Sequence, residues 1–199
     1  QVLDLELLAN HRGSVLGPVP DSPQPSQKAF ESGLCRALRG FDERRPVFVE
    51  SESRKIGQLQ VPGPLIERMR AADCVVLAAS PEFRTRLLRE EYRHFLVEPA
   101  LLAQRLSALV PLHGKARVGH WETLAHRGDW DELVGELLVA HYDPAYERSM
   151  ARNFERLAEA RVLELEARLA SGADCDAAIA RAADELAGLD PLAPAGGSD

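Results

Sequence analysis

The sequence is poor in cysteine and has no long apolar run, and both scarcities exclude classes of protein. Its three cysteines, at positions 35, 74 and 175, lie too far apart to form a CxxC zinc motif, and such sparse cysteines suit a reducing cytoplasm. No apolar run approaches the roughly 18 residues that a membrane span needs. The residues from Gln1 to Glu6 carry acid where a signal peptide carries base. The sequence therefore predicts a cytoplasmic protein with no membrane segment.

The phosphate-binding loop motif GxxxxGK(S/T) is also absent. Gly114-Lys115 is followed by Ala116 and lacks the upstream glycine, so these residues are not expected to cradle a triphosphate in the usual loop. Gln1 is not an initiator methionine, and a strand pattern starts at once at Val2. We therefore expect the sequence to be a fragment of a longer protein.

Charge is spread unevenly over a composition that suits a folded protein. The 199 residues are 45% hydrophobic and 28% charged, with a formal net charge of -7, which predicts one globular domain with an appendage. Residues 1–120 hold 17 basic and 14 acidic side chains, whereas residues 121–199 hold 7 and 17. A polyanion would therefore bind the first part of the chain.

Short runs of branched aliphatic residues alternate with helical patterns in the first part of the chain. The runs Val2–Glu6, Val47–Ser51 and Cys74–Ser80 predict buried parallel strands. Helical periodicity spans 27–38 and 65–72. This alternation predicts an α/β fold, a parallel sheet flanked by helices.

The second part of the chain is expected to be helical. Helices should begin at Ser80-Pro81 and Glu98-Pro99, and a third should run from Trp130 to about Tyr142 until Asp143-Pro144 stops it. From there the apolar stripe Met150–Leu169 predicts one long amphipathic helix, separated by a glycine from a shorter one.

These patterns predict three parts. Residues 1–145 form the α/β domain, residues 146–190 form a helical extension, and residues 191–199, rich in proline, glycine and alanine, form a disordered tail.

Polar clusters follow the predicted strands, where ligands of open parallel sheets bind. The first is Asp4-Leu5-Glu6 followed by Asn10-His11-Arg12-Gly13-Ser14, which could bind phosphate or orient a substrate. After the second strand come Glu50 and Glu52, which could hold Mg²⁺ or act as a base. The alternatives are a solvated loop for the first cluster and, for the second, carboxylates that cap a turn or pair with Arg54.

Two further segments could contact a ligand. Arg84, Arg86, Arg89 and Arg93 form a basic face on the helix after Ser80, suited to phosphates of a nucleotide or RNA, or simply to surface ion pairs. The segment from Gly17 to Lys28 has four prolines and suits a loop over a site, where Gln24, Gln27 and Lys28 could contact ligand or merely fill the loop.

Several strings, taken in order and spacing, resemble the carboxy-terminal part of tRNA 2-selenouridine synthase. The likeness covers about residues 1–150, and its strings are Leu3-Asp4-Leu5-Glu6, Ala9-Asn10-His11-Arg12-Gly13-Ser14, Gln24-Pro25-Ser26-Gln27, Phe30-Glu31, Glu50-Ser51-Glu52-Ser53-Arg54-Lys55-Ile56-Gly57, Val61-Pro62, Trp121 and His141-Tyr142-Asp143-Pro144-Ala145-Tyr146. One departure is Leu16, where the family pattern suggests an aromatic residue.

The resemblance implies a two-part transferase, with a rhodanese-like domain followed by a P-loop domain. The family replaces sulfur of 2-thiouridine at the tRNA wobble position with selenium from selenophosphate, by way of an S-geranylated intermediate made from geranyl diphosphate. Its partners are tRNA and a selenophosphate-supplying enzyme. This sequence has neither the rhodanese domain nor the phosphate-binding loop, and none of its cysteines stands in a context like the family's reactive cysteine, so we expect it to be inactive alone.

The clusters and the resemblance together give the candidate site residues. Mg²⁺ is a candidate cofactor, although no residue is assigned as a metal ligand. The catalytic candidates are Glu50, Glu52 and His11, and the substrate-binding candidates are Arg12, Ser14, Gln24, Gln27, Arg54 and Arg84.

Two other functions fit the same residues. One is a small-molecule kinase-like P-loop domain, with Arg84 and Arg86 on its lid helix and Glu50 as its acid. The other is a noncatalytic module that binds RNA or protein through the Met150–Leu169 stripe, although packing of that stripe on its own domain explains it as well.

Overall fold

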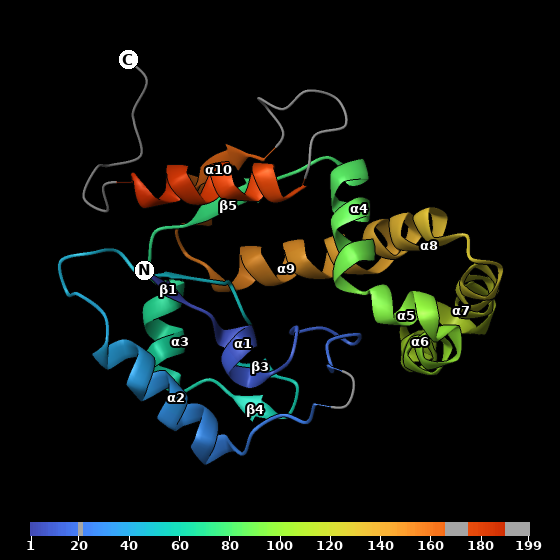
Figure 1. Cartoon of the computed structure of the whole chain (residues 1–199), viewed down its shortest axis with the longest axis horizontal. Helices are drawn as coiled ribbons and strands as arrows, with labels where there is room; N and C mark the ends of the chain where they lie inside the picture. The colour runs from blue at the N-terminus through green and yellow to red at the C-terminus, as the bar shows by residue number, and fades with distance from the viewer. Residues whose placement is uncertain (20–21, 166–174, 190–199) are drawn as a thin grey trace. The chain divides into compact units, whose positions relative to one another are not determined.

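A computed structural model describes residues 1–19, 22–165 and 175–189 (Figure 1). The chain forms two compact units. The first unit comprises Gln1–Leu77, Met150–Leu163 and Ile179–Asp199, and the second comprises Ala78–Ser149 and Glu164–Ala178. The domain boundaries at 145 and 190 stay predictions, and the tail 191–199 lies outside the described residues.

The first predicted strand is cut short by a helix. Strand β1 (Val2–Leu3) pairs in parallel with β2 (Phe48–Val49), with Val2 opposite Phe48. Helix α1 (Leu5–Ala9) follows, because the Asp4 carboxylate accepts a hydrogen bond from the Leu7 N–H at 2.7 Å and caps it. The expectation that the strand reaches Glu6 is therefore wrong.

The described residues form three two-stranded sheets rather than one parallel sheet. Besides β1 and β2, β3 (Lys55–Ile56) and β4 (Leu59–Gln60) form an antiparallel hairpin. The third predicted strand occurs as β5 (Val75–Ala78), but it pairs with β6 (Arg161–Glu164) and not with β1 or β2. The fold is thus mostly helical α/β with small sheets.

The first unit has its own apolar core, to which two predicted helices contribute. Helix α2 (Gln27–Arg39) begins after Ser26, whose Oγ accepts a hydrogen bond from the Ala29 N–H, and helix α3 is Gly63–Arg70. The core packs these helices on β1, α1 and the β3–β4 hairpin, and its buried residues are Leu3, Leu5, Ala9, Phe30, Leu34, Ile56, Leu59, Val61, Ile66 and Met69.

The second unit is helical, as expected. Proline at or near the first helical position marks α4 (Pro81–Glu91), capped by Ser80, and α6 (Pro99–Leu106). Between them lies α5 (Arg93–Val97), and after the short 3-10 turn Ser107–Leu109 comes α7 (Val110–Arg127). Helix α8 (Trp130–Leu137) begins where expected.

Two helix boundaries differ from expectation. Pro144 does not end the helical segment. A π-helical turn, Leu138–Tyr142, leads from α8 directly into α9 (Asp143–Asn153). Proline is tolerated there because first-turn N–H groups need no helical partner.

The long helix predicted over Met150–Leu169 does not form either. Helix α9 ends at Asn153, the turn Leu157–Glu159 follows, and the chain then extends into β6. The N–H groups of Arg161 and Leu165 donate to the carbonyls of Cys74 and Ala78, so backbone pairing with β5 outweighs helical periodicity. Residues 166–169 lie outside the described residues, and the last described helix is α10 (Cys175–Ala187). Among the described helices, none is long and apolar enough to cross a membrane.

Two leucines of α1 provide a test of the first unit's core. Leu5 is fully buried, whereas Leu7 is 75% exposed. We expect Leu5→Ala to lower the free energy of unfolding by about 3 kcal/mol, because it removes buried apolar surface and leaves a cavity. Leu7→Ala should change it by less than about 0.5 kcal/mol. Urea titration followed by far-ultraviolet circular dichroism measures both, and equal losses would contradict the assignment of this core.

Candidate functional site

Acidic side chains meet at the carboxyl ends of β1 and β2. Glu50 follows β2 directly, and its Oε1 accepts a hydrogen bond from the Glu6 N–H at 2.7 Å. Glu6 lies in α1, just after the cap Asp4, and Glu52 lies two residues beyond Glu50. Because parallel strands bring their carboxyl ends to the same edge, this is where ligands of open α/β sheets bind.

We refer to Glu6, Glu50 and Glu52 as the carboxyl cluster, and burial raises the pKa of two of its members. Burial raises the pKa of Glu6 to about 8, helped by a hydrogen bond to the Glu52 carboxyl and by the charges of Glu52, Glu50 and Asp4. Burial also raises the pKa of Glu50, although backbone hydrogen bonds oppose this. Glu6 therefore keeps its proton near neutral pH, which is the property of a group that both accepts and returns protons.

The loop after α1 buries a histidine. His11 is 7% exposed, and its backbone forms an isolated antiparallel β-bridge with Pro18. The Arg12 N–H donates a hydrogen bond to the Gly17 carbonyl at 3.0 Å. The Gly13 N–H donates to His11 Nδ1 at 3.1 Å, so Nδ1 is the acceptor and the neutral ring carries its proton on Nε2. The loop thus fixes both the position and the tautomer of the imidazole.

Two glycines with positive φ allow close approaches to this loop. Gly13 has φ of 64°, and a Cβ there would overlap the Glu52 carboxylate. Gly57 has φ of 59°, and a Cβ there would overlap the Gln24 amide and lie 2.8 Å from His11 Cδ2. Glu52 therefore packs against the backbone of Gly13, and His11 packs against that of Gly57. A residue with a side chain would clash at either position.

The structure gives the two candidate glutamines backbone partners. Gln24 Nε2 donates to the carbonyls of Ala9 and Ile56, and its Oε1 accepts from the Gln58 N–H. Gln27 exchanges two hydrogen bonds with the backbone of Gln60. Both amides join the β3–β4 hairpin to distant parts of the chain, which accounts for them without a ligand. Their role in substrate binding stays a prediction.

The remaining substrate-binding candidates differ in their surroundings. Ser14 Oγ accepts a hydrogen bond from the Leu16 N–H, Arg12 is half-buried in the histidine loop, and Arg54 is exposed just before β3. Arg84 belongs to the second unit, where its guanidinium binds both carboxylate oxygens of Asp143. This hydrogen bonding raises the pKa of Arg84. The first unit thus contains every candidate except Arg84.

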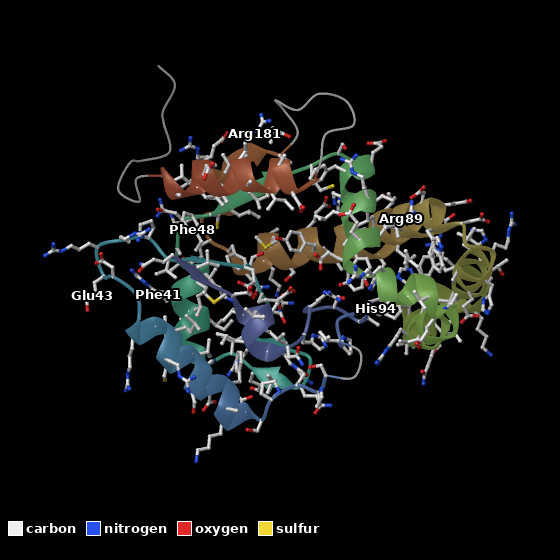
Figure 2. The ribbon with its side chains drawn as sticks, viewed as in Figure 1. Phe41, Glu43, Phe48, Arg89, His94 and Arg181 are labelled. Atoms are coloured by element: carbon white, nitrogen blue, oxygen red, sulfur yellow. The ribbon has the colours of Figure 1, made fainter. Side chains whose placement is uncertain are left out.

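The basic face predicted on α4 is largely engaged within the second unit. Arg86 Nε donates to Cys175 Sγ at 3.2 Å, and Arg89 pairs with Asp131 at 2.8 Å (Figure 2). Two arginines of this face, Arg84 and Arg89, thus form ion pairs, whereas Arg93 lies on the next helix, α5.

Glu6 belongs to the first polar cluster predicted from the sequence, although it is not among the candidate site residues. Its signal was its position in Asp4-Leu5-Glu6, directly after the first strand. Its raised pKa arises from contacts with Glu50 and Glu52, which lie 44 and 46 positions later.

Residues 1–104 match a family model described as the tRNA 2-selenouridine synthase AAA domain. The chain belongs to this family. The matched segment contains all of the candidate site residues and Glu6.

Curated members of the family are similar to the chain over a longer stretch. The tRNA 2-selenouridine synthase of Shewanella sediminis is 29% identical over 185 residues, which cover 79% of this chain and 50% of that protein. The synthase of Alcanivorax borkumensis is 30% identical over 180 residues, which cover 75% and 49%. The chain thus spans about half the length of these relatives. No solved structure matches it.

The raised pKa of Glu6 predicts a pH dependence of stability. The folded state holds this proton to a pKa of about 8, against 4.5 ordinarily, so the contribution of Glu6 is fully present below pH 4.5 and is lost as pH rises through 8. Glu6→Gln should remove this loss and stabilise the protein at about pH 9 by roughly 1 kcal/mol, a value reduced for the side chain's partial exposure.

The matched control is Glu43→Gln, because Glu43 is exposed in the loop before β2 (Figure 2). Thermal unfolding midpoints between about pH 5 and 9 measure the effect. Parallel curves for the wild type and Glu6→Gln would refute a proton held by Glu6.

Proposed function

We propose that this chain is the carboxy-terminal part of a tRNA 2-selenouridine synthase, a transferase that replaces sulfur of 2-thiouridine at the tRNA wobble position with selenium. Selenophosphate is the selenium donor, and the reaction passes through an S-geranylated intermediate made from geranyl diphosphate. The observation that carries this proposal is the family match over residues 1–104, which includes both the histidine loop and the carboxyl cluster.

We propose that the full-length enzyme is cytoplasmic and contains a rhodanese-like domain and a phosphate-binding loop, so that the first unit is part of a P-loop-like domain. The family's AAA-domain description and the ligand-binding edge at β1 and β2 support this assignment. The partners are tRNA and a selenophosphate-supplying enzyme, and the chain alone is inactive.

The carboxyl cluster suits the proton balance of this reaction. When the thiouridine sulfur attacks C1 of geranyl diphosphate, the C–O bond breaks, diphosphate leaves and the base loses its N3 proton. When selenium of selenophosphate bonds to C2, the C2–S bond breaks, and geranylthiolate leaves and takes a proton. Water then cleaves the Se–P bond, so that phosphate leaves and N3 regains a proton. We assign the first proton to the Glu6–Glu52 pair, which returns it in the second step, because Glu6 has a pKa of about 8.

Charged groups around the cluster suit the phosphate groups of both co-substrates. Arg12 and Arg54 bind diphosphate or selenophosphate oxygens, and His11 donates from Nε2. Glu50 fits Mg²⁺, because carboxylate oxygens are its preferred ligands. When bound, Mg²⁺ would neutralise charge on the leaving diphosphate.

The decisive assay uses the full-length protein with 2-thiouridine tRNA, geranyl diphosphate and selenophosphate, followed by digestion and mass analysis of the nucleosides. We expect selenium in place of sulfur at the wobble uridine, and a geranylated nucleoside when selenophosphate is omitted. If neither product forms while another family member is active in parallel, the function is refuted. Phosphoryl transfer without tRNA would favour the kinase-like alternative.

Substitutions in the full-length enzyme measure how much each site residue contributes to kcat and KM. Glu6→Gln and Glu52→Gln should each lower kcat about 100-fold, because each removes half of the pair that carries the proton. Arg12→Ala should mainly raise KM for the phosphorylated co-substrates. The matched control is Glu67→Gln, an exposed residue on α3. Wild-type kcat in Glu6→Gln would show that the cluster is structural.

A further inference from the structure

A second group of potential ligands lies in the second unit, on the adjacent helices α7 and α8 (Figure 1). His120 comes from α7, and Glu132 and Glu136 come from α8. One ligand atom from each of the three lies within 4.8 Å of the other two. We refer to these residues as the α7–α8 triad.

The spacing of the triad suits a small divalent ion. His120 Nε2 lies 3.1 Å from Glu136 Oε1. Tetrahedral zinc, with bonds of about 2.0 Å, places neighbouring ligand atoms about 3.3 Å apart, so these two atoms already span one edge of such a site. Glu132 precedes Glu136 by four residues and therefore lies on the same face of α8. Its exposed side chain can complete the site by a rotamer change.

A buried tryptophan outside the triad orients one of its carboxylates. Trp121 is fully buried, and its indole Nε1 donates to Glu136 Oε2 at 2.9 Å. This bond leaves Oε1 directed at His120. Orientation of a ligand by a hydrogen bond from a surrounding group is typical of metal sites.

The negative charges of the two glutamates in the triad also favour binding of a cation. Glu132 and Glu136 are like charges one helical turn apart, which is unfavourable without compensation. In the part of the chain that the structure describes, no lysine or arginine forms an ion pair with either carboxylate. The nearby Arg89 and Arg127 pair with Asp131 and Asp129 instead. A divalent ion would neutralise both glutamates at once.

We propose that His120, Glu132 and Glu136 form a binding site for a divalent transition metal of the zinc type. An imidazole among the ligands favours zinc, cobalt or nickel over magnesium. Three protein ligands leave a fourth position for water or an incoming group. The site would also link α7 to α8. It uses none of the carboxyl cluster of the first unit and does not depend on the function proposed above.

Cobalt titration of the 199-residue protein tests this site, because tetrahedral Co²⁺ absorbs visible light strongly and Zn²⁺ displaces it. We expect one Co²⁺ per chain, displaced by Zn²⁺ and not by Mg²⁺. His120→Ala and Glu132→Gln should each weaken Co²⁺ binding at least about tenfold, since each removes one of three ligands. Their circular dichroism should match that of the wild type, because both side chains are exposed.

The matched control is His126→Ala. His126 is an exposed histidine on the same helix, α7, and its Nδ1 contacts the Glu122 carbonyl rather than the triad. It should bind Co²⁺ as the wild type does. Zn²⁺ should raise the unfolding midpoint of the wild type and of His126→Ala but not of His120→Ala. The proposal is overturned if His120→Ala binds Co²⁺ as tightly as the wild type, or if binding is lost in Glu50→Gln instead.

Discussion

The hydrogen bond from the Glu6 N–H to Glu50 is the contact on which the first unit's site depends. It joins the end of β2 to the first turn of α1, and so holds two acidic segments together although they lie 44 residues apart. The helix N-terminus accounts for this partner, since first-turn N–H groups have no acceptor within the helix. Once Glu50 is fixed, Glu52 lies against Gly13 and Glu6 is left to share its environment with two carboxylates. The unusual titration of Glu6 follows from this arrangement.

The features that the sequence predicted are those set by neighbouring residues. Ser80 marks a helix start because its hydroxyl group caps the N–H group three residues later, and Pro99 marks another because its fixed φ suits a first turn. The sequence also places the polar loop from His11 to Ser14 and the pair Glu50 and Glu52 after apolar runs, and the role of these residues in a site stays a prediction.

The features that it missed depend on residues far apart in the chain. The pairing of β5 with β6 joins positions near 76 and 163, and it replaced a helix that apolar spacing alone favoured. The hydrogen bonds of Gln24 with the backbone of Ile56 and Gln58 likewise span 32 and 34 positions. The raised pKa of Glu6 also depends on residues far away in the chain, because a pKa is a property of the environment of a group.

The π-helical turn between α8 and α9 determines how α9 is rotated about its axis relative to α8. Its wider ring, closed by the Asp143 N–H to the Leu138 carbonyl, holds one residue more than an α-helical turn. Each residue turns an α-helix by about 100°, so loss of one residue from Leu138–Tyr142 would rotate α9 by that angle relative to α8. Asp143 would then no longer face Arg84. Chain length in this turn is therefore as constrained as residue identity, and related sequences should vary here by substitution rather than by insertion or deletion.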